Sequence, residues 1–169
     1  KQPVVYEDAK VFMGIYLMER KVLIELIKRA YERGGSDFLI DGIMRFQDKY
    51  SIYGFCHDGY VAHINSVGSY YRASMDMLQP HIRQELFTAE QRVYTKTKDE
   101  PPVQYKKNAA AKNSLIANGC VIEGSVENSI LFRGVKIGKG VKVKNSIIMQ
   151  KCDLQQDALV ENVICDKNV

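Results

Sequence analysis

The sequence lacks several features that would assign a protein to a class at once. No apolar run approaches the ~20 residues that a membrane-spanning helix needs. The first apolar stretch lies between Lys10 and Lys21, a charged context unlike that of a signal peptide. No C-x-x-C spacing occurs among the four cysteines, Cys56, Cys120, Cys152 and Cys165. We therefore expect a cytoplasmic protein with buried, unpaired thiols and no membrane partner.

Acidic residues are missing from one stretch of the chain. The formal net charge is +4, and residues 1–100 are balanced, so the excess lies in residues 101–169. The overall basicity and interleaved aromatic residues of a nucleic-acid binder are absent, so we expect no nucleic-acid partner. The stretch between Glu127 and Asp153 has no acid but holds Arg133, Lys136, Lys139, Lys142, Lys144 and Lys151. This cluster is either a site for a phosphorylated effector or an acidic partner surface, or an ordinary solvated face.

The first hundred residues mix short apolar runs with segments of helical spacing. Runs rich in β-branched and aromatic residues predict strands over 11–17, 50–56 and 59–64. Apolar residues at helical spacing predict helices over 19–33, about 38–46 and 66–78. Ser36 or Asp37 is expected to cap the second helix, and Pro80 to stop the third. The pair Pro101-Pro102 predicts a boundary between a domain at 1–100 and another at 101–169.

A six-residue period marks the second domain. Apolar residues recur six apart in the series Val135, Val141, Ile147, in the series Ile137, Val143, Met149, and in the series Ile148, Leu154, Val160. A longer signature, Asn-Ser/Val followed by apolar residues, recurs at offsets of 15, 17 and 17 residues, at Asn113, Asn128, Asn145 and Asn162.

These periods predict a left-handed parallel β-helix of hexapeptide repeats. Each six-residue unit would supply one short strand and one corner, and three units would complete a coil. Stacked coils would pair their backbones and line up their apolar residues in inward ladders. An antiparallel sandwich is the alternative, but it does not predict a fixed step of six. Glycines with positive φ are expected at the corners, at Gly119, Gly124, Gly134, Gly138 and Gly140.

Short motifs along nearly the whole chain carry a family resemblance. They are Met-Gly-Ile-Tyr at 13–16, Asp-Phe-x-x-Asp at 37–41, Gly-Tyr at 59–60, Ser-Tyr-Tyr-x-Ala-x-Met-Asp at 69–76, Pro-Pro at 101–102 and the repeats from Asn113 to Gly138. In this order they resemble bacterial glucose-1-phosphate adenylyltransferase, also called ADP-glucose pyrophosphorylase. The resemblance implies that residues 1–100 are the tail of a Rossmann-like nucleotidyltransferase domain. Since the chain opens on Lys1 and lacks the family's glycine-rich nucleotide loop, we expect a piece of a longer protein.

The family makes ADP-glucose from ATP and glucose 1-phosphate with Mg²⁺, for glycogen synthesis, and its members are usually tetramers regulated by phosphorylated metabolites. Three residues depart from the family pattern where the resemblance places its pocket. His63 stands where the family has a metal-binding Asp, and imidazole is a poor ligand for Mg²⁺. Phe12 replaces a sugar-lining Ser, and Ile40 replaces a Lys. Gln104, in the linker, replaces a further Lys.

These departures imply a degenerate pocket with no catalytic and no metal-binding residue in this chain. The resemblance is therefore greatest to a non-catalytic D-type subunit, which would modulate a catalytic subunit within a hetero-oligomer. The alternatives are a competent nucleotidyltransferase with a different metal shell, a hexapeptide acyltransferase and an exchange-factor subunit. An acyltransferase of this class generally carries a catalytic His on its coils, whereas His57, His63 and His81 all precede Pro101.

Overall fold

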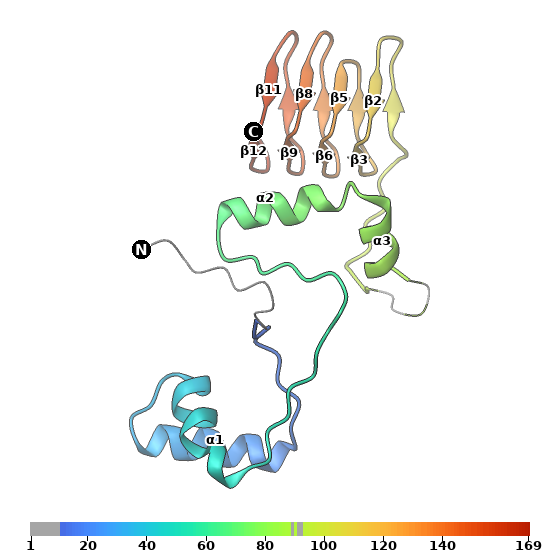
Figure 1. Cartoon of the computed structure of the whole chain (residues 1–169). Coiled ribbons are helices and arrows are strands. Elements are labelled where there is room, and N and C mark those ends of the chain that lie inside the picture. Colours follow the sequence, from blue (N-terminus) through green and yellow to red (C-terminus); the bar gives the residue numbers. More distant parts are fainter. Residues whose placement is uncertain (1–10, 89, 91–92) are drawn as a thin grey trace, which may run out of the picture. The chain divides into compact units, whose positions relative to one another are not determined.

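The computed structural model describes residues 11–88, 90 and 93–169 (Figure 1). The chain divides into two compact units, Lys1–Asp58 and Gly59–Val169. The second unit thus includes residues on both sides of Pro101, and a domain boundary at that pair stays a prediction. Within the described ranges, no helix is both long and apolar enough to cross a membrane.

The first unit is helical. Its helix α1 (Arg20–Glu32) confirms the helix predicted at 19–33 and buries Leu26 and Ala30. The segment predicted as one helix at 38–46 is instead a π-helix, η1 (Phe38–Ile43), followed by a 3-10 helix, η2 (Met44–Lys49). The Asp37 carboxylate caps η1 by accepting a hydrogen bond from the backbone N–H of Ile40 at 2.8 Å.

The strands predicted at 11–17, 50–56 and 59–64 are wrong for this structure. All three segments are irregular, and no strand is described before residue 104. A strand needs a neighbour to pair with its backbone N–H and C=O groups, and the described part of the chain offers none to these segments. Their apolar side chains are left open to solvent, with Leu17 101%, Phe55 93% and Tyr53 88% exposed.

The second unit contains the predicted β-helix of hexapeptide repeats. Three four-stranded parallel sheets form its walls, with strand orders β1-β4-β7-β10, β11-β8-β5-β2 and β12-β9-β6-β3. We call them sheets A, B and C, and we number the coils one to four from β1–β3 to β10–β12. The first two coils hold β1 (Gln104–Tyr105), β2 (Ala110–Lys112), β3 (Leu115–Ile116), β4 (Val121–Ile122), β5 (Ser125–Glu127) and β6 (Ile130–Leu131). The last two hold β7 (Lys136–Ile137), β8 (Lys142–Lys144), β9 (Ile147–Ile148), β10 (Asp153–Leu154), β11 (Leu159–Glu161) and β12 (Ile164–Cys165).

One core runs through the coils. It contains most of the apolar residues of the predicted six-residue series, among them Val135, Val141, Ile137 and Val143, each at most 2% exposed. Ile147 is an exception, because adjacent strand residues face opposite sides and its neighbour Ile148 takes the inward place. The inward ladder was therefore predicted correctly except at this member.

The corners use asparagine as well as glycine. Gly119, Gly134 and Gly140 have positive φ as predicted, but Gly124 and Gly138 do not. Gly124 is needed for close approach instead, since a Cβ there would lie 2.3 Å from the carbonyl oxygen of Val141. The signature asparagines Asn113, Asn128, Asn145 and Asn162 have φ of 44, 45, 47 and 56°. Asparagine is among the few non-glycine residues that adopt this left-handed conformation readily.

Serines after these asparagines join the coils. The hydroxyl of Ser146 accepts the N–H of Val163 at 3.1 Å and donates to the carbonyl of Lys144 at 2.7 Å. Ser129 does the same one coil earlier, accepting from Ser146 at 3.0 Å. Because Ser129 and Ser146 are fully buried, each hydroxyl must find partners inside the protein, and the repeat supplies them.

Two helices belong to the same unit as the β-helix. The first, α2 (Val67–Asp76), confirms the helix predicted at 66–78 and begins with a capping box between Ser66 and Ser69. The second, α3 (Pro80–Leu86), was not predicted, because Pro80 was interpreted only as a stop signal. It occupies the first turn of α3, where its missing N–H costs nothing.

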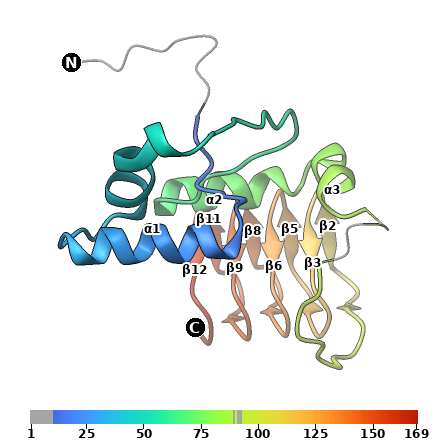
Figure 2. The same cartoon turned by 90° about the horizontal axis from the view of Figure 1, so that it is seen from below.

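Helix α2 runs across sheet C, as both views show (Figures 1 and 2). The Tyr71 hydroxyl donates to the carbonyl of Asn145 at 2.7 Å. Past the C-terminal end of α2, Leu78 lines a recess of about 210 Å³ together with Leu115 of the first coil. The outward row of sheet C is apolar, which explains why each signature ends in two apolar residues: one faces the core and the other faces α2. This row consists of Leu115, Ile130, Ile147 and Ile164.

Candidate functional site

The predicted cation cluster is divided between different walls of the β-helix. Lys136 lies on β7 in sheet A, whereas Lys142 and Lys144 lie on β8 in sheet B. Arg133 and Lys139 occupy corners between strands. All except the half-buried Arg133 are exposed. The structure therefore brings only Lys142 and Lys144 onto one face, as their alternation along a strand requires.

Acidic side chains from neighbouring coils lie opposite these cations. Lys136 is in register with Asp153, and their charged groups are 4.0 Å apart. In sheet B, Lys144 lies between Glu127 and Glu161 in the register of the strands. The absence of acids between Glu127 and Asp153 along the chain thus does not hold in space.

One outward row of sheet B alternates in sign. It reads Lys112, Glu127, Lys144, Glu161 from the first coil to the fourth. The first pair is an ion pair at 3.4 Å. Lys142 belongs to the neighbouring row, where its in-register neighbours are Ser125 and Leu159. Lys142 is therefore the cation of sheet B whose charge the ladder does not balance.

Phe12 and Ile40, two of the predicted pocket residues, lie in the first unit. Phe12 is 54% exposed, and its ring centroid is 5.1 Å from that of Tyr16. Tyr16 in turn meets Phe38 edge to face at 5.4 Å. Ile40 is 56% exposed on η1. Phe12 thus joins an aromatic cluster that the sequence did not predict.

His63, the third predicted pocket residue, lies in the second unit, in the irregular segment before α2. Its side chain is exposed. Among the described residues there is no group of three or more His, Cys, Asp and Glu side chains that can hold a metal ion. The described residues therefore do not offer Mg²⁺ the carboxylate ligands that it prefers.

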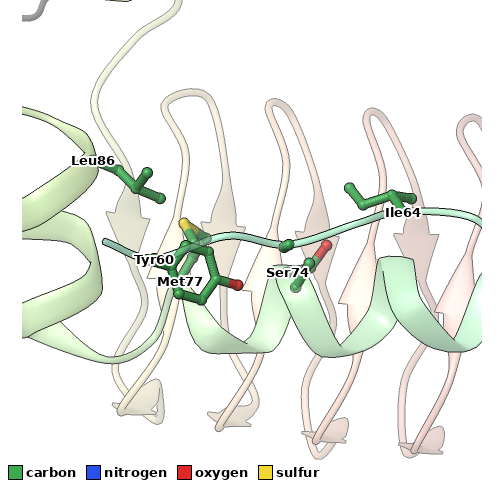
Figure 3. Close-up of a pocket in the computed structure, with 7 residues that line it drawn as sticks. Tyr60, Ile64, Ser74, Met77 and Leu86 are labelled. Atoms are coloured by element: carbon green, nitrogen blue, oxygen red, sulfur yellow. The ribbon is translucent and has the colours of Figure 1, made fainter. Parts of the chain in front are cut away.

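Two residues of the family motifs meet at a groove that the sequence did not single out. The Tyr60 hydroxyl donates to the Asp76 carboxylate at 2.8 Å, and the Tyr60 N–H donates to Glu85 of α3. Removal from water raises the pKa of Tyr60, and the hydrogen bond and charge of Asp76 raise it further. The groove, about 380 Å³, is lined by Ala62, Ala73 and the residues labelled in Figure 3: Tyr60, Ile64, Ser74, Met77 and Leu86.

This groove is almost wholly apolar, and its only ordered polar pair fastens residues 59–64 to the helices. Tyr60 links that segment to α2 through Asp76 and to α3 through Glu85. Its arrangement suits a structural contact better than acid–base chemistry, because no second titratable group lines it.

The four cysteines have different surroundings. Cys120 and Cys152 are fully buried and Cys165 is partly buried, as predicted, and none of the four forms a disulfide. The prediction of a buried thiol is wrong for Cys56, which is exposed because its segment packs against no strand. Burial raises the pKa of Cys120, and it raises that of Cys165 together with the neighbouring Cys152 and Asp166.

Comparison with known proteins identifies both the fold and the wider family. A family model described as "GlmU-like, C-terminal hexapeptide" matches residues 101–169. A "Glycogen biosynthesis protein GlgD" of Bacillus subtilis (strain 168) is 45% identical over 165 residues, which cover 98% of this chain and 48% of the relative. A protein of the same name from Geobacillus stearothermophilus is 46% identical over 131 residues, 78% of this chain and 38% of the relative. A "Glucose-1-phosphate adenylyltransferase" of the same organism is 35% identical over 135 residues, 78% of this chain and 35% of the relative.

The four stacked coils and the family model define a hexapeptide-repeat β-helix protein. Since the matches extend through most of the residues before the β-helix, the chain belongs to the glucose-1-phosphate adenylyltransferase family, and glycogen biosynthesis proteins named GlgD are among its relatives. The predicted resemblance is thereby confirmed. The chain spans about half the length, or less, of these curated relatives.

Proposed function

We propose that this chain is part of a regulatory subunit of ADP-glucose pyrophosphorylase, catalytically deficient by itself, that acts in glycogen biosynthesis. The observation that carries the proposal is the 45% identity over 98% of the chain to a protein named for glycogen biosynthesis rather than for an enzymatic reaction. The identity to a named glucose-1-phosphate adenylyltransferase is lower, at 35% over 78% of the chain.

Residue chemistry supports the deficiency. In the family pattern, the position of His63 holds a carboxylate that binds Mg²⁺, and a neutral imidazole provides neither the charge nor the hard oxygen ligand. Phe12 would bring a phenyl ring to a place where the family has a hydroxyl, and Ile40 removes a cation. Each change weakens a different part of the site: metal, sugar and charge. The proposed subunit would therefore bind substrates poorly and would not turn them over.

The proposed partner is a catalytic subunit of the same enzyme, joined to this one in a hetero-oligomer. Oligomers commonly use extended, regular surfaces, and the walls of the β-helix are such surfaces. Lys142 is our first candidate for contact with an acidic partner surface or a phosphorylated metabolite, because sheet B leaves its charge unbalanced. Lys136 and Lys144 are weaker candidates, since in-register acids already oppose them.

A pyrophosphorolysis assay of the full-length protein with ADP-glucose and pyrophosphate tests the proposal. The protein is assayed alone and then mixed with a catalytic subunit from the same cell. We expect no turnover by the protein alone and a changed rate or substrate affinity in the mixture. Robust turnover by the protein alone would show that it is a competent nucleotidyltransferase and that the proposal is wrong.

Two matched variants distinguish the roles of the histidines. His63→Ala and His81→Ala both remove an exposed imidazole from the second unit. For a regulatory subunit, neither variant changes the activity of the mixture by more than the scatter of the assay. If His63→Ala alone abolishes turnover, His63 is a working ligand or base, and the alternative of an active enzyme with a different metal shell is correct.

A further inference from the structure

The fourth coil holds the only pair of sulfur atoms in contact among the described residues. The Sγ atoms of Cys152 and Cys165 are 3.9 Å apart, and both side chains are thiols. Cys152 is fully buried, and Cys165 is partly exposed. We propose that this pair is an oxidation site, at which a peroxide converts the two thiols into an intramolecular disulfide that closes the fourth coil.

The coil repeat shows that this pairing is a specific feature of the last coil. Cys152 precedes the sheet A strand of its coil, as Val103, Cys120 and Val135 do in theirs. Cys165 takes the inward place on sheet C that Ile116, Leu131 and Ile148 take in the earlier coils. The repeat therefore sets the same two core positions side by side four times. Only the fourth coil has sulfur at both.

Cys120 is a natural control within the same chain. It is fully buried, and its thiol donates to the carbonyl of Phe132 at 3.1 Å, as the Cys152 thiol donates to that of Asp166 at 2.9 Å. The residue beside Cys120 in the core is Leu131, which has no sulfur. Cys120 thus shares the burial and hydrogen bonding of Cys152 but lacks a partner with which to form a disulfide.

The geometry requires only a small movement. A disulfide needs the two sulfur atoms about 2 Å apart, so rotation of the two side chains must shorten the present distance by roughly as much again. Cys152 gives up one weak hydrogen bond to Asp166 in doing so. The chain enclosed by the bond is residues 152–165, a single turn around the helix, so no other coil has to move.

The reaction begins at Cys165, the more accessible sulfur. Its thiolate attacks a peroxide oxygen, the O–O bond breaks, and the products are a sulfenic acid at Cys165 and water. The sulfur of Cys152 then attacks the sulfenic sulfur. The S–S bond forms, the S–O bond breaks, and the departing hydroxide takes the thiol proton as a second water. In total, two thiols lose two electrons, and the peroxide gains them.

The reaction depends on pH, because only a thiolate attacks the peroxide. Desolvation raises the pKa of Cys165, and the adjacent Cys152 and Asp166 raise it further. Near neutral pH the thiol form dominates, so the disulfide forms slowly and needs an excess of oxidant. We expect the rate to increase as the pH rises toward the pKa of Cys165.

Tryptic peptides of the oxidised full-length protein provide the test. Trypsin cleaves after Lys151 and Lys167, so one peptide carries both cysteines, while Cys120 falls in a separate peptide. The protein is treated with hydrogen peroxide, quenched, alkylated in denaturant, digested and weighed. We expect the peptide 152–167 to lose two hydrogen atoms and to take up no alkyl group until dithiothreitol is added. The peptide with Cys120 should take up its alkyl group throughout.

The exposed Cys56 reports whether the oxidant was sufficient. If Cys56 is oxidised while the peptide 152–167 still accepts two alkyl groups, the proposal is overturned. Oxidation of Cys165 beyond the sulfenic acid without a link to Cys152 would overturn it as well.

Cys165→Ile is the matched variant, because it installs the side chain that Ile148 provides in the coil before. We expect Cys152 in this variant to remain as alkylatable as Cys120. Equal oxidation of Cys152 with and without Cys165 would show that the two sulfurs do not react with each other.

Discussion

The two units of the chain differ in where their backbones find partners. In the β-helix every strand pairs with a strand one coil away, within 15 or 17 residues along the chain. In the first unit, the extended residues on either side of the helices have no strand beside them among the described residues, and many of their large apolar side chains are exposed.

The difference teaches how far each region specifies itself. A repeat that pairs only with its neighbours carries its structure in its own sequence. A segment of a sheet with distant partners does not, because its strands form only when those partners are present. The exposed apolar residues of the first unit and the buried ones of the β-helix are thus different consequences of the same apolar composition.

The largest expected effect comes from truncating the core of the β-helix. Ile148 is fully buried in the core, whereas Leu17 in the first unit is 101% exposed. Ile148→Ala should lower the free energy of unfolding by about 2–5 kcal/mol, because it removes buried methylene groups and leaves a cavity. Leu17→Ala should change it by less than about 0.5 kcal/mol. Urea denaturation followed by circular dichroism measures both, and equal losses would contradict the comparison.

The serine that joins neighbouring coils gives the next effect. Ser146→Ala leaves the Val163 N–H without its present acceptor in a buried place. We expect a loss of about 1–3 kcal/mol in the free energy of unfolding. Ser51→Ala, at an exposed position of the first unit, is the control and should be close to neutral. A neutral Ser146→Ala would mean that this hydrogen bond does not help to hold the coils together.

Alkaline pH should destabilise the second unit. The pKa values of Cys120, Cys165 and Tyr60 are raised in the folded state, chiefly by burial. Their stabilising contribution is complete below the unfolded pKa, about 8.5 for a thiol. It is lost as the pH rises through the folded pKa, since the unfolded chain then releases protons more easily.

Urea midpoints measured from pH 7 to pH 10 should therefore fall at the upper end. Cys120→Val copies the residue that Val135 supplies one coil later, and it should make this fall shallower. An unchanged slope in the variant would show that Cys120 does not contribute to it.

The smallest effect concerns the row of alternating charges. Lys144→Glu places a third carboxylate between Glu127 and Glu161, and like charges in register destabilise a sheet. We expect a loss of about 0.2–1 kcal/mol that shrinks as salt is added. Lys142→Glu, on the same face between Ser125 and Leu159, should cost less. A greater loss in Lys142→Glu would mean that the register does not control these charges.

Much of the second unit could be predicted from the sequence, because its partners are local. The step of six and the asparagine signature predict the coils, and the caps and apolar spacing predict α1 and α2. Helix α3 was missed because proline both stops one helix and begins another, and only the residues that follow decide which. Cys56 was misplaced for a similar reason: its burial depends on neighbours that the sequence near it does not provide.

The candidate site was harder to predict. The cations from Arg133 to Lys144 are consecutive charges along the chain, yet they occupy several walls and meet acids 15 or 17 residues away. That pairing depends on the length of each coil, which alternates rather than keeping three units of six. The contact between Tyr60 and Asp76 lies within two recognised motifs, but no spacing rule links residues 16 positions apart across a loop.

The contact of Tyr71 with the third coil, and of Leu78 with the recess at the first, matches two different rulers. Strands in adjacent coils are about 4.7–4.9 Å apart, while one turn of an α-helix rises 5.4 Å. Because these lengths are close, each turn of α2 can rest on one coil over the short distance that the helix covers. An α2 several turns longer would drift out of step with the coils, so this helix measures a short stack well and a long stack poorly.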